Sequence, residues 1–155
     1  MNNNQVLPWD HPRFRSWIAV ARSCQLMQQV LARSLAELDI KPPHLDILVN
    51  LYRFDGLTQQ ELARKLLVGR SNMSMLLPHM EKRGLIARTG DTRDKRVLRL
   101  SLTEEGRTLA RQAMEIQTAV IERTLSHTPI ERCEELATIM ESIGTVLLTE
   151  LRDEN

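Results

Sequence analysis

The chain has 155 residues, which suffices for one domain or for one domain with an oligomerisation extension. Hydrophobic residues make up 42% of the sequence and aromatic residues only 3%, so the core must consist of aliphatic side chains and methionine, which favours helices packed on helices. No stretch is apolar enough for a membrane span or a secretory signal, and two cysteines, Cys24 and Cys133, are too few and too far apart for a disulfide framework or a zinc site. We therefore expect a cytoplasmic protein without a metal or other cofactor.

The N-terminal region is expected to begin with a disordered tail over residues 1–9 and to continue as a long helix. Asp10 is the expected N-cap of this helix, which should run to about Asp39. Its apolar residues include a set at successive sevens, namely Trp17, Cys24, Leu31 and Leu38. A seam of this length requires another long helix against it, so residues 10–40 are interpreted as an N-terminal dimerisation helix.

The middle of the chain contains several helix signals. Pro42 begins a second helix, which should end before Gly56. Thr58 and Glu61 have the spacing of a capping box, in which the threonine side chain accepts a bond from one free N–H group and the glutamate reaches back to another. This box predicts a short third helix, and Gly69 then supplies the turn into a fourth.

The segment from Gly69 to Leu102 predicts a helix, a stop at Gly84, a strand, a charged loop and a second strand. One apolar stripe on this helix consists of Met73, Leu76, Leu77 and Met80. The second strand alternates, with Leu98, Leu100 and Leu102 on one side and Val97, Arg99 and Ser101 on the other. The loop between the strands, residues 89–96, is too polar to pack. A helix with a small polar outer face beside a basic hairpin has a shape that fits DNA.

Positive charge is concentrated in the same part of the chain. From Arg64 to Arg99 there are ten Lys and Arg against three acids, a local balance of +7, whereas the whole chain has a net charge of +1. Clustered positive charge is the electrostatic footprint of phosphate binding. The alternative interpretation is a solvated charged surface without a nucleic-acid partner.

Two further helices are predicted near the C-terminus. Thr103 is the expected cap of a fifth helix that ends near Leu125, and the run TPIE from Thr128 is the expected start of a sixth. Residues 103–155 are thus interpreted as C-terminal dimerisation helices. The first, fifth and sixth helices cannot cover their apolar seams on the module between them. Packing between two copies would bury these seams, so we expect a homodimer.

Several short motifs of the central segment occur together in a characteristic order. They are LTQQELA from Leu57, GRSNMS from Gly69, EKRGLI from Glu81, DTRDKR from Asp91 and LTEEG from Leu102. In this order and spacing they resemble the winged helix-turn-helix of the multiple antibiotic resistance regulator (MarR) family.

The resemblance implies a mainly α fold with a small β-wing, in which a winged helix-turn-helix module at residues 41–102 lies between long dimerisation helices. It also implies a homodimeric transcription regulator of a pseudo-palindromic operator, by family habit a repressor relieved by a small phenolic or lipophilic anion. The sequence departs from the family pattern at Pro78, which lies inside the recognition helix, and at Met75 and His79, where relatives often carry longer basic or polar side chains.

Residue chemistry selects the candidate contacts to double-stranded DNA. On the recognition helix the expected base-reading residues are Arg70, Ser71, Asn72, Ser74 and Met75, with His79 at the margin. Ser71 could alternatively serve only as a helix cap. Lys82 and Arg83 are expected at phosphates. In the wing, the candidates for phosphate and minor-groove contacts are Arg93, Lys95 and Arg96. Arg96 is the groove residue by resemblance, and Asp94 is expected to orient it or to hold the loop.

Three other interpretations remain open. By the same resemblance, the residues that would line an effector pocket are Arg15, Trp17 and His44; the alternative is that Trp17 belongs to the core and Arg15 is a surface charge. Some relatives sense oxidants through a cysteine of the first helix, but Cys24 shares the apolar seam, where a buried thiol is usually inert. A winged helix that binds protein instead of DNA would be favoured by Pro78 and Met75. No catalytic motif occurs, so an enzyme is not expected.

Overall fold

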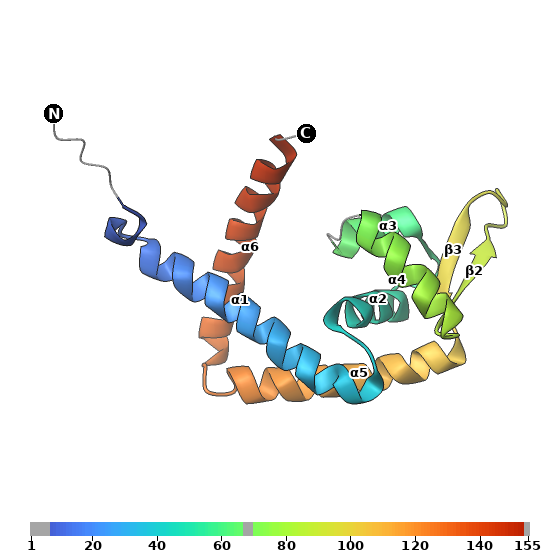
Figure 1. The fold of residues 1–155 in the computed structure, drawn as a ribbon, viewed down its shortest axis with the longest axis horizontal. Coiled ribbons are helices and arrows are strands. Elements are labelled where there is room, and N and C mark those ends of the chain that lie inside the picture. Colours follow the sequence, from blue (N-terminus) through green and yellow to red (C-terminus); the bar gives the residue numbers. More distant parts are fainter. Residues whose placement is uncertain (1–6, 67–69, 154–155) are drawn as a thin grey trace. The chain divides into compact units, whose positions relative to one another are not determined.

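A computed structural model describes residues 7–66 and 70–153 of the chain. It is mainly helical with one small sheet, so the expected fold class is confirmed (Figure 1). In chain order the elements are η1 Pro8–Asp10, α1 Phe14–Leu35, η2 Ala36–Leu38, α2 Pro42–Arg53, β1 Leu57–Thr58, α3 Gln59–Leu66, α4 Arg70–Lys82, β2 Ile86–Gly90, β3 Leu98–Leu102, α5 Glu104–Leu125 and α6 Ile130–Asp153, where η marks a 3₁₀-helix. The described chain divides into two compact units within α5, one up to Gln117 and one from Thr118 onward.

Helix α1 begins later than the sequence indicated. Pro8 and Trp9 form a 3₁₀ turn with Asp10, so the expectation of a disordered tail is wrong for these two residues. The expected cap is also wrong, because Asp10 belongs to this turn and the N-cap of α1 is Arg13. The His11 ring instead accepts the backbone N–H of Arg13 through Nδ1 at 3.1 Å.

Helix α1 ends at Leu35, short of the expected Asp39. The chain tightens into η2, and Asp39 follows with a φ of 51°, a left-handed conformation that cannot continue a helix. Asp tolerates this conformation better than most residues because its short polar side chain can bond locally. The break turns the chain into α2, whose first residue is Pro42, as expected from the fixed φ of proline.

Helix α2 lies at the centre of the first unit and contacts α1, α3 and β3. Its buried apolar face consists of Leu45, Ile47, Leu48 and Leu51. The same core includes Leu62 of α3, Met73, Leu77 and Met80 of α4, and Leu100 of β3. The apolar stripe expected on α4 is therefore confirmed, with Leu76 half-buried at its edge. Burial of each such side chain contributes about 1.5–3 kcal/mol, so the core holds α4 firmly on the module.

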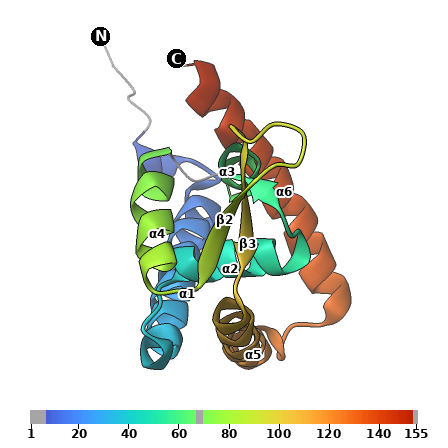
Figure 2. The same cartoon turned by 90° about the vertical axis from the view of Figure 1, so that its right-hand side faces the viewer.

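In the described residues the sheet has three antiparallel strands in the order β1-β3-β2, one more than the sequence indicated. Strand β1 has only two residues, too few for an alternating pattern to show. Figure 2 shows β2 and β3 as a hairpin, and Thr89 and Gly90 extend β2 into the expected loop by pairing with Arg99 and Leu98. Leu98 is 45% exposed whereas Leu100 is fully buried, because the hairpin projects past the core at this point.

Side-chain caps connect the helices to the sheet. The expected capping box is confirmed: Thr58 Oγ1 accepts the N–H of Glu61 at 3.2 Å, and Glu61 Oε2 accepts the N–H of Thr58 at 2.8 Å. Thr103 Oγ1 accepts the N–H of Gly106 at 3.0 Å and donates to the Gly84 carbonyl at 2.6 Å. The cap of α5 thus also secures the turn that follows α4.

Helix α4 continues through Pro78 to Lys82, although this proline has no N–H with which to bond the Ser74 carbonyl. Gly84 then has a φ of 71°, which agrees with its predicted role in ending the helix. The turn predicted at Gly69 lies outside the described residues.

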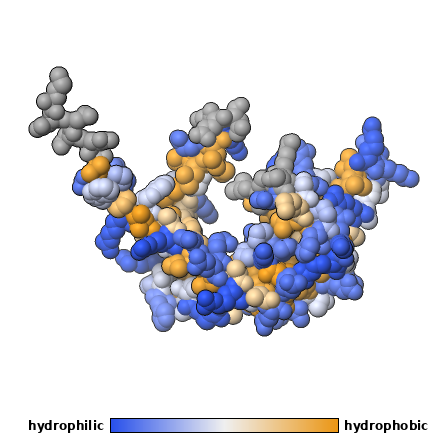
Figure 3. All heavy atoms as spheres, viewed as in Figure 1, coloured by the Kyte–Doolittle hydropathy of each residue, from blue (hydrophilic) through white to orange (hydrophobic). Residues whose placement is uncertain are grey.

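Helices α1 and α6 each leave apolar side chains exposed within one chain (Figure 3). On α1 these are Trp17, Ile18, Leu26, Met27 and Val30. On α6 they are Ile130, Leu136, Ile139, Ile143, Val146, Leu147 and Leu151. Cys24, expected within a buried seam, is exposed because this part of α1 is uncovered in the single chain. No helix in the described part of the chain has the length and apolarity needed to cross a membrane.

Candidate nucleic-acid interface

The outer face of α4 is polar and accessible. Asn72, Ser74, Met75 and His79 are exposed on it. Met75 is 76% exposed, so its apolar surface is open to a partner. Arg70 and Ser71 are the first residues of α4, and their side chains lie outside the described part of the structure. The hydroxyl, amide and thioether groups on this face are of the kinds that contact base edges and thymine methyl groups.

The two cations that end the helix have different surroundings. Lys82 is exposed. Arg83, predicted with it as a phosphate contact, instead donates to the backbone carbonyls of Asp39 at 2.6 Å and of Leu38 at 3.4 Å. Its guanidinium therefore holds the connection between α1 and α2 against the end of α4. Arg83 thus has a structural role that the sequence did not indicate, and its phosphate contact stays a prediction.

The wing tip presents its cations to solvent. Arg93 and Lys95 are exposed, and the Arg96 side chain is 91% exposed. Asp94 accepts the backbone N–H of Arg96 at 3.0 Å and the guanidinium Nε and Nη2 of the same residue at 3.1 and 3.2 Å. The side-chain hydrogen bond from Arg96 lowers the pKa of Asp94. Solvent screens so exposed a pair, so it contributes little to stability, but it restricts the orientations of Arg96.

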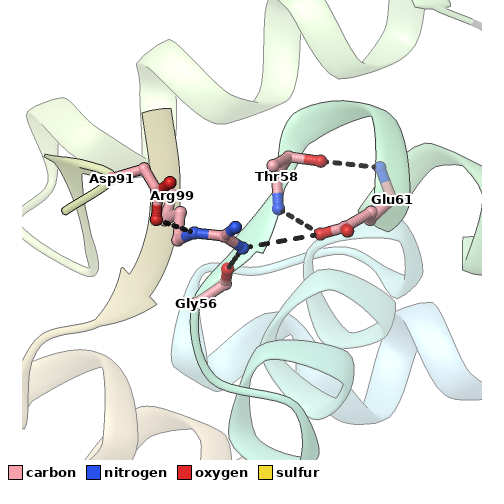
Figure 4. A network of polar contacts seen from close by, with 5 residues as sticks. All are labelled: Gly56, Thr58, Glu61, Asp91 and Arg99. Carbon is pink, nitrogen blue, oxygen red and sulfur yellow. Dashed lines mark hydrogen bonds and ion pairs between the residues drawn. The ribbon is translucent and has the colours of Figure 1, made fainter. Parts of the chain in front are cut away.

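A second arginine pairing lies at the root of the wing (Figure 4). Arg99 donates through Nε to Asp91 Oδ1 at 2.9 Å and through Nη1 to the Gly56 carbonyl at 2.9 Å. The same Nη1 lies 4.0 Å from Oε2 of Glu61, the residue that closes the capping box with Thr58. The hydrogen bond from Arg99 lowers the pKa of Asp91, and the carboxylate in turn raises the pKa of Arg99. Arg99 thus connects β3, the wing and the start of α3.

Arg88 makes a further link inside the module. It donates through Nε to Glu81 Oε1 at 2.6 Å and through Nη1 to Gln59 Oε1 at 3.1 Å, which joins β2 to α4 and α3. The sequence did not indicate these roles of Arg88 and Arg99, because only the fold brings their partners near them. Their position within strands, rather than in the loop, is the one sequence signal that separates them from the tip cations.

The positive charge of the module therefore serves two purposes. Of the ten cations between residues 64 and 99, Arg83, Arg88 and Arg99 bind groups on other segments of the chain, and Arg96 pairs with Asp94 of its own loop. The cations of the wing tip and Lys82 face solvent. The local balance of +7 thus overstates the charge that is available to phosphates.

A hollow of about 840 Å³ adjoins the recognition helix. Its lining includes Gln29 of α1, Lys41 and His44 at the start of α2, and Leu76 and His79 of α4. His44 Nδ1 accepts the Lys41 N–H at 3.0 Å, so the neutral ring carries its hydrogen on Nε2. Burial lowers the pKa of His44, and repulsion from the neighbouring His79 and Arg83 lowers it further. The His44 and His79 rings lie 5.8 Å apart between centroids.

The structure does not bring the three expected effector residues together in one chain. His44 lines the hollow just described, whereas Trp17 lines a separate hollow beside η1. Arg15 is exposed and, in the described part of the chain, lines neither of these hollows. The reason is the length of α1, whose 22 residues span roughly 33 Å between the N-terminal turn and the start of α2.

Helices α3 and α4 and the β2–β3 hairpin together form a winged helix-turn-helix. The second helix exposes its polar face, its opposite face is anchored in the core, and a cationic hairpin lies at the end of the module. This combination defines a class of DNA-binding module.

Comparisons with known proteins identify the family. The MarR family model matches residues 38–97. Over 126 residues the chain is 29% identical to the HTH-type transcriptional repressor MdtR of Bacillus subtilis (strain 168), with 81% of each protein covered. An uncharacterized HTH-type transcriptional regulator of Bacillus cereus is 31% identical over 103 residues, which cover 66% of this chain and 68% of that protein. The chain belongs to the MarR family of DNA-binding transcription regulators.

Solved structures share the fold. CouR, a transcriptional repressor bound to a 23-mer DNA duplex, matches with a TM-score of 0.74 and 25% identity over 81% of this chain and 89% of that chain. CouR from Rhodococcus jostii RHA1 bound to p-coumaroyl-CoA matches with a TM-score of 0.76 and 23% identity over 88% of this chain and 94% of that chain.

Proposed function

We propose that two copies of the chain bind a two-fold-symmetric operator and repress transcription until a small organic anion binds beside the recognition helix. The observation that carries the proposal is the accessible polar face of α4, which the core holds in place next to the cationic wing tip. The names of two similar proteins support repression: MdtR is a transcriptional repressor, and CouR is a repressor bound to DNA.

The exposed apolar faces of α1 and α6 support the homodimer. Each carries large hydrophobic side chains that one chain leaves in water, a cost that packing against a second copy removes. Dimers of this class place their recognition helices in half-sites about one helical turn apart, which predicts a pseudo-palindromic operator.

The exposed residues of the module suggest a division of roles on the operator. Asn72 has the chemistry to read adenine, and Met75 has the apolar surface to contact a thymine methyl. Arg96 enters the minor groove from the wing, while Lys82, Arg93 and Lys95 bind phosphates. Ser74 and His79 complete the described reading surface on α4. Arg70 and Ser71 stay predicted base contacts, and their side chains lie outside the described part of the structure.

The hollow beside α4 is the proposed effector site, and it replaces the three-residue pocket expected from the sequence. Lys41 and the Nε2–H of His44 supply donors for an anion, and Leu76 supplies apolar surface. Because Leu76 and His79 belong to α4, an occupant would contact the recognition helix directly. Occupancy would then shift the population toward helix positions that no longer fit the operator. The binding of p-coumaroyl-CoA by CouR supports an acyl or aromatic anion as the type of ligand.

Selection of bound duplexes from a random DNA pool at near-physiological salt tests DNA recognition. We expect enrichment of one two-fold-symmetric site, and an affinity for it that falls steeply as salt is raised because counterions are released. An unchanged pool would contradict sequence-specific binding and favour the alternative in which the winged helix binds protein.

The selected duplex then serves to test the effector site. We expect p-coumaroyl-CoA or benzoate to release the wild-type protein from the duplex and to lose this effect with Lys41→Ala. Peroxide is the control treatment, since Cys24 is exposed. Release by peroxide that Cys24→Ser abolishes would favour thiol-based sensing instead.

A further inference from the structure

Arg99 lies at the junction of the wing and the helix-turn-helix. It belongs to β3, the middle strand, and pairs in register with Thr58 of β1 on one side and Thr89 of β2 on the other. Its side chain is 40% exposed, less than half the exposure of the Arg96 side chain at the tip. Figure 4 shows its guanidinium between Asp91 on one side and Gly56 and Glu61 on the other.

The partners of Arg99 belong to two segments, the start of α3 and the wing. Toward α3, the Gly56 carbonyl and the Glu61 carboxylate belong to the segment that the Thr58 capping box closes. Toward the wing, Asp91 closes the loop, since its N–H donates to the Val97 carbonyl at 2.8 Å.

The backbone extends this connection into the wing tip, because the Val97 N–H in turn donates to the Asp94 carbonyl at 2.9 Å. The side chain of Asp94 then accepts the guanidinium of Arg96 and orients it. At the root of the wing, the hydrogen bond from Arg99 is the main cause of the lowered pKa of Asp91.

We propose that Arg99 is a positioning residue for DNA binding: through Asp91 it sets the place of the wing tip relative to α3 and α4, and it does not itself neutralise a phosphate. The inference rests on the operator binding proposed above. A planar guanidinium can address several acceptors in fixed directions, which the single ammonium of lysine cannot do. Geometry rather than charge is therefore the property that this site requires.

Operator affinity of charge-matched variants tests the proposal. Asp91→Asn removes a negative charge next to a DNA-facing surface, so simple electrostatics predicts tighter binding. Loss of positioning predicts the opposite sign, and we expect Asp91→Asn to weaken binding to the selected duplex on the order of tenfold, a typical effect of losing one charge-assisted hydrogen bond. Arg99→Lys, which keeps the charge, should weaken binding about as much as Arg99→Ala. The control is Asp55→Asn, which makes the same charge change at an exposed acid outside this network.

The salt dependence separates positioning from direct contact. If Arg99 neutralises a phosphate, Arg99→Lys should bind like the wild type and Arg99→Ala should lower the slope of log affinity against log salt by about one. Either result would overturn the proposal, as would equal or tighter binding by Asp91→Asn.

Hydrogen exchange of the free protein tests the connection without DNA. In Asp91→Asn and Arg99→Lys we expect faster exchange at the hydrogen-bonded amides of Asp91, Arg96 and Val97, with unchanged exchange in α2. Unchanged exchange at the tip would overturn the proposal. Failure of the wild type to select a duplex would instead refute operator binding, and the exchange result would still decide whether Arg99 fixes the wing.

Discussion

Helices α4 and α6 both carry apolar side chains at helical spacing, but they differ in what covers those side chains. On α4, Met73, Leu77 and Met80 are fully buried in a core shared with α2, α3 and the sheet. On α6, Ile130 is 74% exposed and Val146 is 59% exposed. The chain therefore buries the apolar face of the proposed recognition helix itself, whereas it leaves the apolar side chains of α6 exposed.

The buried face of α4 should therefore matter for folding, and the exposed face of α6 for the proposed assembly of two copies. Changes at the buried face of α4 should lower the stability of the module. Changes at the exposed face of α6 should lower the affinity of one copy for another and, through it, the affinity for a two-site operator. The expected effects below run from the largest to the smallest.

Ile139→Glu on α6 should convert the dimer into a 17.9-kDa monomer, because it places a charge on a face that a second copy is proposed to cover. A dimer that binds both half-sites has an affinity about a hundredfold to ten-thousandfold higher than a single half-site contact, so operator affinity should fall by that factor. Light scattering and titration of the selected duplex measure the two effects. Thr138→Glu adds the same charge at the neighbouring position as a control. A dimer that persists in Ile139→Glu would show that a second copy does not cover this face of α6.

Leu77→Ala on α4 should lower the free energy of unfolding by about 2–5 kcal/mol, because it removes a fully buried side chain and leaves a cavity. Met75→Ala, on the exposed face of the same helix, should change stability by no more than about 0.5 kcal/mol while weakening DNA binding. Urea unfolding of both variants provides the comparison. Equal destabilisation by the two substitutions would show that the core does not hold α4 in the way described.

Two glycines, one in the covered part of the chain and one on the exposed helix α6, should respond differently to an added methyl group. A Cβ at Gly106 of α5 would overlap the Leu85 carbonyl oxygen, so Gly106→Ala should destabilise the module by about 1–3 kcal/mol. At Gly144 of α6 no described atom lies within 4 Å of the added Cβ, so Gly144→Ala should stabilise the helix by up to about 1 kcal/mol. Thermal unfolding distinguishes the two signs. A weaker dimer with Gly144→Ala would show that the partner packs closely there.

The pH dependence of stability should report on His44, a buried histidine at the edge of this core. Burial opposes its charged form and lowers its pKa below the ordinary 6.5. As pH falls from 6.5 through the folded-state pKa, the unfolded chain binds a proton that the folded chain does not, so stability should decrease. His44→Asn keeps an acceptor for the Lys41 N–H and should flatten this decrease in urea titrations. A decrease of unchanged size in His44→Asn would assign it to another group.

The helices were largely predictable because their signals are local. The Thr58–Glu61 box, the Thr103 cap and the stop at Gly84 each join residues a few positions apart, and each is present in the structure. Errors occurred where local signals competed, as at Asp10, which forms part of a 3₁₀ turn instead of capping α1. The two-residue strand β1 was missed because its partners on β3 lie more than forty positions away.

The candidate site was predictable only in part, for the same reason. Exposure of Asn72, Ser74 and Met75 follows from the opposite apolar stripe, since a helix places residues on faces by simple periodicity. The roles of Arg83 and Arg99 do not follow from periodicity. Each binds an acceptor more than forty positions away in sequence, and neither contact could be predicted from the neighbouring residues.

Local periodicity and capping chemistry thus decided where the helices and the wing lie along the chain, and which face of each is apolar. They could not decide which apolar face is covered within one chain, because α4 and α6 have the same kind of pattern. Nor could they decide which arginines remain available to DNA, because a charge acquires its partner only when distant segments meet. Burial and ion pairing are relations between elements, so they first exist when the elements have packed.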